Sequence, residues 1–566
     1  MKTVKRALAL VLALTLLLAM SATVFAAAQT YSITVKNENK SISIKDNTYY
    51  AYRIFDATYN GDNVAYTVNK NFTGFTYTVS DESYQGEALI NYLADLTADS
   101  AALDAFAKAA LDYATTNHIS AAGKVKATGE TAVISVDAPG YYLVAGTATA
   151  PNNQTVTAAC SLTTAKPDAE VNVKADVPSI DKKIVEESGK VEANTANIGD
   201  KVSYEITSKV PNMKGYTQYF FVMNDTLSKG LTYNGDMVIK VGEKTLDATN
   251  GYTLTTTNND DGSTTLEIVF KNFIQYTTGN AITVTYSATL NQDANLDPSV
   301  GNPNEVKLVY SNNPNVVGTG DTGNPDKPAP GDATGETPKS ETKTYVTGIK
   351  LTKVDGQNKN QTLTGAKFEI KGDGMKVVLV NNEMYKESAK GESAKGTYYM
   401  LKDGTYTTTV PVTDKNNAGY NADQYDDVNQ KYEKVTAVTK DTVNTKVNAT
   451  GYVDENGVLT FKGLGAGSYT ITELVAPNGY NLLKESIKVN ITAEAALDKC
   501  TWIVTAGSNI VTADGNLYAF QVENNAGAEL PSTGGIGTTV FYVLGGLLVV
   551  CAGVLLITKR RMNKNA

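Results

Sequence analysis

Three extended segments far apart in the sequence each place one polar residue in line with apolar ones. Side chains along a strand alternate between its two faces, so residues two apart share a face. The polar residues are a lysine, an asparagine and a glutamate, and burying them is costly unless they satisfy one another. The three sets are Ile349, Leu351 and Lys353; Phe520, Val522 and Asn524; and Tyr469, Ile471 and Glu473.

A lysine, an asparagine and a glutamate buried together could form an amide bond. Removal from water disfavours charge, so a buried amine loses its proton readily and a buried carboxyl keeps one. The neutral amine of Lys353 would be a nucleophile, and a protonated Glu473 could polarise the carbonyl of Asn524. The product would be an amide crosslink, with release of ammonia. The alternatives are a hydrogen-bonded polar trio, or a register shifted by one residue that brings in Asn525.

The N-terminus has the pattern of a secretory signal peptide. Basic residues precede an unbroken apolar run from Ala7 to Met20, and small residues spaced two apart follow it. This order is typical of a signal that is removed on export and not of a membrane span. We expect cleavage after Ala26 or Ala28.

The C-terminus combines a short motif, an apolar span and a basic tail. The run from Ile536 to Ile557 is long enough, at about 1.5 Å per residue, to cross roughly 30 Å of hydrocarbon. The basic residues after it would stay in the cytoplasm and leave everything upstream outside. The order of the three parts resembles a sortase cell-wall sorting signal, with the motif Leu530, Pro531, Ser532, Thr533 and Gly534.

The composition favours β-structure and argues against a nucleic-acid partner. Charged residues make up 19% of the chain, whereas threonine, valine, asparagine and the 33 tyrosines are abundant, which favours strands. The net charge of −9 is unsuited to nucleic acid. Cys160 and Cys500 are far apart and Cys551 lies in the apolar span, so we expect no disulfide framework and another source of stability.

Alternating strand patterns divide the mature chain of about 500 residues into three β-domains. The first carries a helical insertion from about Glu87 to Tyr113, and the other two have the pattern of immunoglobulin-like β-sandwiches. We therefore predict an all-β chain of tandem sandwiches with one C-terminal transmembrane helix. The predicted segments are 1–28 (signal peptide), 29–170, 171–345, 346–526 and 527–566 (sorting signal).

Three polar stretches belong to loops or excursions. Gly318 to Thr342 is rich in Gly, Pro and Asp, which predicts an exposed loop before the last strand of the second domain, near Thr344 to Thr347, or the linker to the third domain. Asn381 to Asn448 is either a large excursion between strands or a hairpin-rich subdomain. Asn258 to Gly262 is acidic but lacks the spacing of an EF-hand loop, so we expect a hairpin turn and no metal site.

The stretch from Tyr469 to Tyr480 resembles the E-box of Gram-positive pilins, with Leu474 where the family usually has threonine. The surrounding domain resembles a CnaB-type sandwich, a fold that contains an internal isopeptide bond. The resemblance therefore implies a bond between Lys353 and Asn524, with Glu473 as the catalytic acid.

The second domain resembles the isopeptide-forming middle domain of backbone pilins, in which a lysine joins an asparagine more than a hundred residues later. Carried over residue by residue, this implies a bond between Lys182 and Asn304 with Asp225 as catalyst. Lys183 is a competing choice, and a solvated charge pair is the alternative.

A polymerising pilin also needs an exposed amine to receive the sorting motif of its neighbour. Family members carry it at the junction of the first two domains, usually as Tyr-Pro-Lys within a valine-rich strand. Here Val171 and Val173 alternate before Lys174, but the Tyr-Pro is missing. The resemblance implies Lys174 as the polymerisation lysine, and Lys166 is a second possibility.

The resemblance covers nearly the whole chain and implies a secreted, peptidoglycan-anchored backbone subunit of a covalent pilus with a role in adhesion. The partners it implies are pilus-specific and housekeeping sortases, neighbouring pilin subunits, peptidoglycan and a host or bacterial surface ligand. The alternative is a tip or wall-anchored adhesin, which needs no acceptor amine. We expect no enzyme, cofactor or metal, because His118 is the only histidine and hydrolase and zinc motifs are missing.

Two internal crosslinks predict that the mature chain is lighter than its sequence mass by two molecules of ammonia, measured by accurate intact mass. In Glu473→Ala the mass deficit should fall to one molecule of ammonia, because the third domain then folds without its crosslink. An unchanged sequence mass would contradict crosslinking in both domains.

Overall fold

The computed structural model describes most of the chain between Thr30 and Met562. The described residues are 30–98, 100–372, 375, 377–380, 384–388, 396–402, 406–435, 438–439, 450–527 and 536–562. The predicted signal peptide, the motif Leu530 to Gly534 and much of the polar stretch Asn381 to Asn448 lie outside them.

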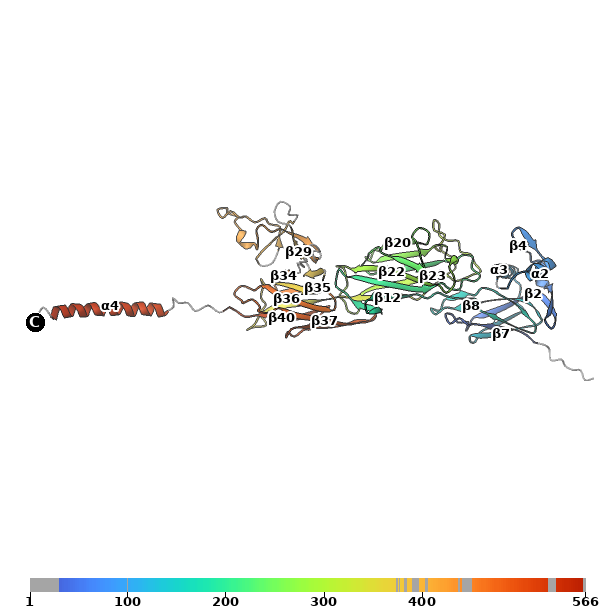
Figure 1. Cartoon of the computed structure of the whole chain (residues 1–566), viewed down its shortest axis with the longest axis horizontal. Coiled ribbons are helices and arrows are strands. Elements are labelled where there is room, and N and C mark those ends of the chain that lie inside the picture. The colour runs from blue at the N-terminus through green and yellow to red at the C-terminus, as the bar shows by residue number, and fades with distance from the viewer. Residues whose placement is uncertain are drawn as a thin grey trace, which may run out of the picture.

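Three β-domains follow one another along the long axis of the molecule, and a single helix extends beyond the third (Figure 1). The first domain, in blue, lies at one end of the row, and the second, in green, lies between the other two. Each domain contains two main sheets. The predicted all-β architecture with a helical insertion in the first domain is confirmed.

The first domain packs a smaller sheet against a larger one, and two helices cover the larger sheet. In the smaller sheet, β1 pairs parallel with β11 and antiparallel with β7. Helix α3 buries Phe106, Ala107 and Ala110 against Ile54 and Leu143, because these three positions share one face of the helix. The elements are β1 (Tyr31–Lys36), β7 (Thr131–Val136) and β11 (Asp168–Asn172); β2 (Thr48–Asn60), β3 (Asn63–Val68), β6 (Gly123–Lys126), β8 (Gly140–Thr149), β9 (Thr155–Thr157) and β10 (Ser161–Ala165); β4 (Tyr77–Val79) and β5 (Glu82–Tyr84); and η1 (Lys70–Phe72), α2 (Gly86–Ala94) and α3 (Ala101–Thr116).

The second domain is a sandwich of two seven-stranded sheets. Its strands alternate regularly, as in β15, where Val202, Tyr204 and Ile206 face the core and the residues between them are less buried. One sheet has the order β13 (Gly189–Val191), β12 (Asp181–Glu186), β15 (Lys201–Lys209), β22 (Ala281–Leu290), β18 (Val238–Val241) and β19 (Lys244–Thr245), with β17 (Leu231–Tyr233) also on β22. The other has the order β14 (Ala193–Thr195), β25 (Ser340–Tyr345), β23 (Asn302–Ser311), β16 (Phe221–Leu227), β21 (Thr264–Phe270) and β20 (Tyr252–Asn258), with β24 (Thr334–Glu336) also on β23.

The third domain is a sandwich in which the first and last long strands are neighbours. β26 and β40 pair in parallel, with Lys353 opposite Val522 and Asp355 opposite Asn524. One sheet has the order β33 (Val438–Thr439), β28 (Val377–Val380), β35 (Val458–Leu464), β26 (Thr347–Asp355), β40 (Leu517–Asn524) and β39 (Thr512–Asp514). The other has the order β34 (Thr450–Tyr452), β27 (Lys367–Gly372), β36 (Gly467–Val475), β37 (Ile487–Ala495) and β38 (Cys500–Ala506).

The loops differ from the expectations in one place. The predicted exposed loop Gly318 to Thr342 contains strand β24 and the start of β25, because Thr334 and Ser340 bring the chain back onto β23.

Asn258 to Gly262 forms the hairpin turn between β20 and β21, and Gly262 adopts a φ of 83° there. The described part of Asn381 to Asn448 forms small two-stranded pairs that project from the third domain (Figure 1): β29 (Met384–Glu387) with β32 (Tyr432–Val435), and β30 (Tyr399–Met400) with β31 (Tyr406–Thr407).

The first two domains share a continuous apolar core and a polar linker contact. Ala175 and Val177 of the linker are buried in a cluster that reaches into both domains. The Asp176 carboxylate accepts hydrogen bonds from Asn39 of the first domain at 2.7 Å and from the backbone of Asn212 in the second at 2.8 Å. Since β11 continues to Asn172, the boundary lies a few residues beyond the expected position at 170.

The second and third domains are joined by close backbone packing. The Ile198 amide donates to the Gly463 carbonyl at 3.0 Å, and the Tyr469 hydroxyl donates to the Asn197 side chain at 2.8 Å. Gly463 has a φ of 94°, and a Cβ there would lie 2.7 Å from Ile198 Cδ1. Glycine at this position therefore adopts the positive φ without strain and leaves room for the Ile198 side chain.

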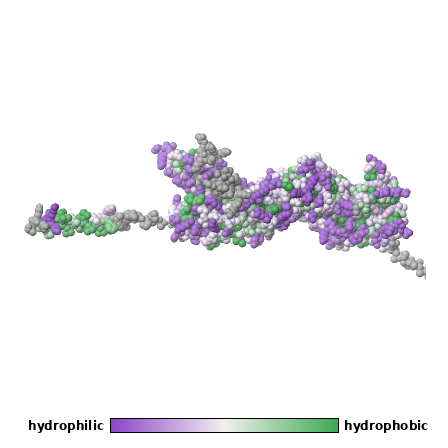
Figure 2. Space-filling model, in the orientation of Figure 1, coloured by the Kyte–Doolittle hydropathy of each residue, from purple (hydrophilic) through white to green (hydrophobic). Residues whose placement is uncertain are grey.

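Helix α4 (Ile536–Met562) extends away from the third domain and carries the predicted membrane span (Figure 1). Val540–Met562 has a mean hydropathy of 2.7, and among the described residues this is the one helix long and apolar enough to cross a membrane. Figure 2 shows apolar residues along it and basic residues, Lys559 to Arg561, close to its end.

Gly463→Ala should loosen the contact between the second and third domains and destabilise the third by about 1–3 kcal/mol, because alanine is strained at positive φ. Hydrogen exchange at the Ile198 amide should accelerate. Gly515→Ala is the matched control, since Gly515 has a φ of 59° and a methyl group added to its Cα would meet no atom within 4 Å. Equal exchange at Ile198 in both variants would contradict this account of the interface.

Candidate crosslinking sites and the anchoring segment

The core of the second domain contains a lysine, an aspartate and an asparagine from three different strands. Lys182 on β12, Asp225 on β16 and Asn304 on β23 are each 0% exposed. Alternation along β12 directs Lys182 and Ile184 inward. Lys183 points to the opposite face, where its Nζ contacts Glu192 at 2.6 Å, so it is not part of the buried group.

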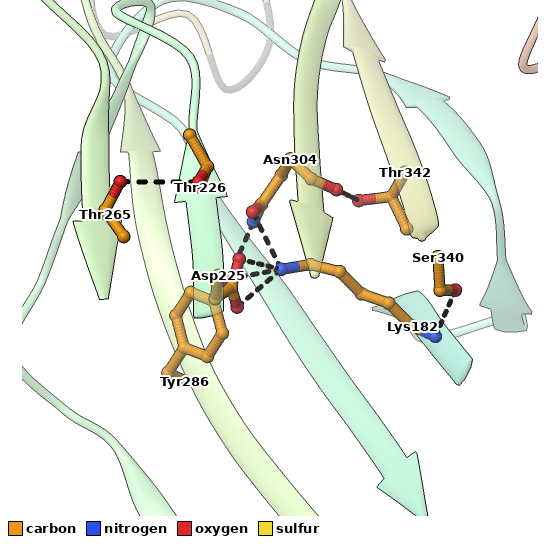
Figure 3. A network of polar contacts seen from close by, with 8 residues as sticks. All are labelled: Lys182, Asp225, Thr226, Thr265, Tyr286, Asn304, Ser340 and Thr342. Carbon is orange, nitrogen blue, oxygen red and sulfur yellow. Dashed lines mark hydrogen bonds and ion pairs between the residues drawn. The ribbon is translucent and has the colours of Figure 1, made fainter. Parts of the chain in front are cut away.

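Figure 3 shows the Lys182 amine at the centre of this group. Its Nζ lies 2.6 Å and 2.7 Å from the two carboxylate oxygens of Asp225 and 2.7 Å from Asn304 Oδ1. The hydroxyl of Tyr286, on β22, accepts a hydrogen bond from Nζ at 2.6 Å. Nζ also lies 5.2 Å from the ring centre of Tyr204, within the range of a cation–π contact. The hydrogen bonds of the amine thus go to side chains from three other strands, β16, β22 and β23.

Burial changes the protonation of this lysine. Removal from water lowers the pKa of Lys182 to about 8, and the carboxylate of Asp225 opposes that shift. Lys182 and Asp225 form an ion pair at 2.6 Å with both side chains fully buried, and such a pair loses much of its hydration. A neutral amine is a nucleophile, and the carbon of the Asn304 amide is one bond from the oxygen it touches.

The third domain contains the second buried trio. Lys353 is 0%, Asn524 1% and Glu473 4% exposed. Asn524 Nδ2 donates to both carboxylate oxygens of Glu473 at 3.0 Å, and Lys353 Nζ donates to the backbone carbonyl of Val522 at 2.7 Å. Burial lowers the pKa of Lys353 to about 8, against the effect of Glu473. Asn525, the alternative in a shifted register, is exposed.

The two trios differ in which strands they connect. In the second domain, Lys182 and Asn304 belong to opposite sheets. In the third, Lys353 and Asn524 lie on adjacent parallel strands of one sheet, and Glu473 comes from the facing sheet. A bond in the second domain would tie the sheets together, whereas a bond in the third would tie the first strand to the last. In the described part of the first domain no lysine is buried, so no comparable trio occurs there.

Both candidate acceptor lysines lie on the first domain. Lys174 follows β11, and its Nζ lies 3.4 Å from the Asp104 carboxylate on α3, with 22% of the lysine side chain exposed. Lys166 lies 3.2 Å from the Asp62 carbonyl oxygen and is 27% exposed. No sequence pattern pointed to the Asp104 contact, because helix α3 and Lys174 come together only in the folded domain.

Tyr286 is the member of the buried group that sequence analysis missed. Its hydroxyl donates to Asp225 Oδ2 at 2.7 Å and accepts from Asn304 Nδ2 at 2.8 Å. The only signal in the sequence was its inward position in the alternating strand Ala281 to Leu290. Many tyrosines here occupy such positions, so this pattern could not single it out.

Comparison with known proteins assigns three parts of the chain. Residues 198–314 match the family of the Cna-B-like domain of Gram-positive pilin backbone subunit 2. Residues 426–503 match a prealbumin-like fold domain, and residues 522–564 match the LPXTG cell wall anchor motif.

A curated relative and several solved structures are similar over most of the chain. The trypsin-resistant surface T6 protein of Streptococcus pyogenes serotype M6 is 28% identical over 406 residues, which cover 69% of this chain and 70% of that protein. The structure of the T6 backbone pilin of S. pyogenes is 16% identical, with a TM-score of 0.49, and covers 88% of this chain and 99% of its own. The structure of BcpA, the major pilin subunit of Bacillus cereus, is 17% identical, with a TM-score of 0.40 and the same coverage.

Backbone-pilin, prealbumin-like and anchor segments occur in that order, and the apolar helix follows the last domain. Together these matches support a sortase-assembled backbone pilin of Gram-positive bacteria, a structural subunit of surface pili that is anchored to the cell wall.

Proposed function

We propose that this pilin is stabilised by two internal Lys–Asn isopeptide bonds, Lys182–Asn304 and Lys353–Asn524, and is polymerised through Lys174. The observation that carries the proposal is the buried Lys182 amine, which lies 2.6 Å from Asp225 and 2.7 Å from Asn304 Oδ1. A charged lysine in this position would be costly to bury. Reaction with the amide converts it into a neutral group.

In the second domain, neutral Lys182 attacks the amide carbon of Asn304 while the protonated Asp225 polarises the carbonyl. The new bond joins Nζ to Cγ, the bond from Cγ to Nδ2 breaks, and one ammonia leaves. No oxidant or cofactor is needed. Each bond forms once within its own chain, so the protein is a substrate of its own chemistry and not an enzyme.

In the third domain, Glu473 is the proposed acid for the bond between Lys353 and Asn524. Asn524 Oδ1 is buried and accepts no hydrogen bond from the described residues. A half-turn of the amide would direct this oxygen at Glu473, where a carboxyl proton could polarise it. The backbone amide of Leu483 donates to Glu473 at 2.9 Å and helps to hold the carboxyl in place.

Lys174 is the proposed acceptor for the sorting motif of the next subunit. A sortase cysteine would cleave between Thr533 and Gly534, and the lysine amine would resolve the thioester. Lys174 precedes the second domain and the motif follows the third, so joining them extends a fibre. The Lys174 and Asp104 side chains are 22% and 15% exposed, so their contact at 3.4 Å must open for the reaction.

The proposed partners follow from this chemistry. A pilus-specific sortase joins the subunits, a housekeeping sortase attaches the fibre to peptidoglycan, and neighbouring pilins supply both reacting groups. A role in adhesion to a host or bacterial surface ligand is also part of the proposal.

Crosslinking in the second domain should accelerate as the pH rises toward about 8 and then level off. Burial lowers the pKa of Lys182 to about 8, so the neutral, nucleophilic amine is the minor form below that pH and the major form above it. Below pH 8 the rate should therefore rise by up to about tenfold per pH unit. Intact mass at timed intervals after cell-free synthesis measures the rate, with Asp225→Asn as the uncrosslinked control. A rate that falls as the pH rises toward 8 would contradict attack by the neutral amine.

Lys174→Ala should abolish the ladder of covalent polymers in immunoblots of cell-wall extracts, while secretion, both crosslinks and monomer anchoring persist. Lys174→Arg should also fail, because a guanidinium stays protonated and cannot attack a thioester.

Lys166→Ala is the matched control and should retain the ladder. The opposite pattern would move the acceptor to Lys166. A ladder that survives the double substitution would refute polymerisation through either lysine, whereas its absence in the wild type would favour a wall-anchored adhesin.

A further inference from the structure

The Tyr286 hydroxyl lies among all three groups of the second-domain trio (Figure 3). It accepts hydrogen bonds from Lys182 Nζ at 2.6 Å and from Asn304 Nδ2 at 2.8 Å. It donates its own proton to Asp225 Oδ2 at 2.7 Å. One hydroxyl therefore contacts the attacking nitrogen, the leaving nitrogen and the acid.

The proposed crosslinking reaction requires a proton to move between the two nitrogens. When Nζ of the neutral amine bonds to Cγ of Asn304, it must lose one of its two hydrogens. When Nδ2 leaves as ammonia, it must gain one. The hydrogens balance if that proton passes from Nζ to Nδ2, and because Lys182 and Asn304 are each 0% exposed, a buried protein group is well placed to carry it.

Among the described groups that hydrogen-bond to Lys182 Nζ, the Tyr286 hydroxyl is the one that also hydrogen-bonds to Asn304 Nδ2. Asp225 contacts the amine through both oxygens and the Tyr286 hydroxyl through Oδ2, and in the proposed reaction it is the acid that polarises the carbonyl. The two tasks, polarisation and proton transfer, are thus divided between two side chains.

We propose that Tyr286 is a catalytic residue of the second-domain crosslink and relays the proton from Lys182 Nζ to Asn304 Nδ2. The hydroxyl releases its own proton to Nδ2 as it takes one from Nζ, so it is neutral before and after the step. This inference rests on the proposed Lys182–Asn304 bond and adds a residue to it.

The surroundings of Tyr286 suit a neutral relay. Burial, together with the charge of Asp225, raises its pKa well above the usual value, so a phenolate is disfavoured. The ring stacks on Tyr204, with centroids 5.3 Å apart, and meets the edge of Tyr233 at 5.8 Å. These contacts fix the position of the hydroxyl.

The chain supplies two matched controls. The Tyr204 ring lies as near to Nζ as that of Tyr286, at 5.2 Å against 5.1 Å, but the hydrogen bonds of Nζ go to Asp225, Tyr286 and Asn304 and not to the Tyr204 hydroxyl. In the third domain, Lys353 Nζ donates to the Val522 carbonyl and Asn524 Nδ2 donates to Glu473. Neither of these contacts involves a tyrosine, so the Lys353–Asn524 bond is an internal control for crosslinking without a tyrosine relay.

The test compares Tyr286→Phe with Tyr204→Phe in the mature three-domain chain. Intact mass and peptide mapping at timed intervals after cell-free synthesis measure the rate at which each bond forms. Tyr286→Phe should slow the Lys182–Asn304 bond at least tenfold, since acid–base groups typically contribute about 10²–10⁴-fold. The Lys353–Asn524 bond should form at the wild-type rate. Tyr204→Phe should leave both bonds unchanged. Wild-type rates for both bonds in Tyr286→Phe would overturn the proposal.

A second variant distinguishes loss of the relay from a folding defect in Tyr286→Phe. In this variant 3-fluorotyrosine replaces Tyr286, which keeps both the ring and the hydroxyl. A more acidic phenol should change the rate of the Lys182–Asn304 bond, and the same replacement at Tyr204 should not. An unchanged rate at Tyr286 would count against the relay. If the wild-type chain forms neither bond, the proposed crosslinks fail, and the relay fails with them.

Discussion

The structure depends on two lysines buried in the cores of two β-sandwiches. Lys182 and Lys353 are both fully buried, and burial lowers the pKa of each to about 8. An isolated ammonium in such a place would be strongly destabilising. Lys182 is paired with Asp225 at 2.6 Å, and Lys353 donates to the Val522 carbonyl at 2.7 Å. The same desolvation that makes the lysine costly makes it nucleophilic, and the proposed crosslinks follow from that single constraint.

The crosslinks would replace the disulfides that an extracellular chain of this size often uses. Cys160, Cys500 and Cys551 form no disulfide. Lys182 and Asn304 are 122 residues apart, and a covalent bond over a loop of about 100 residues stabilises the fold by about 5 kcal/mol through the entropy it removes from the unfolded chain. In the second domain the bond would connect the two sheets. In the third it would connect the first and last long strands, so the two crosslinks would restrain their domains in different ways.

The contacts between domains make the row of sandwiches continuous. Asp176 accepts hydrogen bonds from both the first and the second domain, and Ile198 packs against Gly463 at the next junction. Lys174 lies at the first of these junctions, where Asp104 of α3 holds its amine. The proposed polymerisation site is thus next to a well-packed interface between two domains.

The sequence alone determined the features that depend on local periodicity. Alternation identified Lys353, Asn524 and Glu473 as inward-facing, and the apolar run before a basic tail identified the membrane span, because strand and span patterns need only neighbouring residues. The resemblance to pilins supplied Asp225 and Lys182. Tertiary structure alone decided the choice between Lys182 and Lys183, which are adjacent residues on opposite faces of β12. It also decided the contacts of Tyr286 with Asn304 and of Lys174 with Asp104, because those residues meet only when separate sheets or a distant helix pack together, and no local pattern encodes that packing.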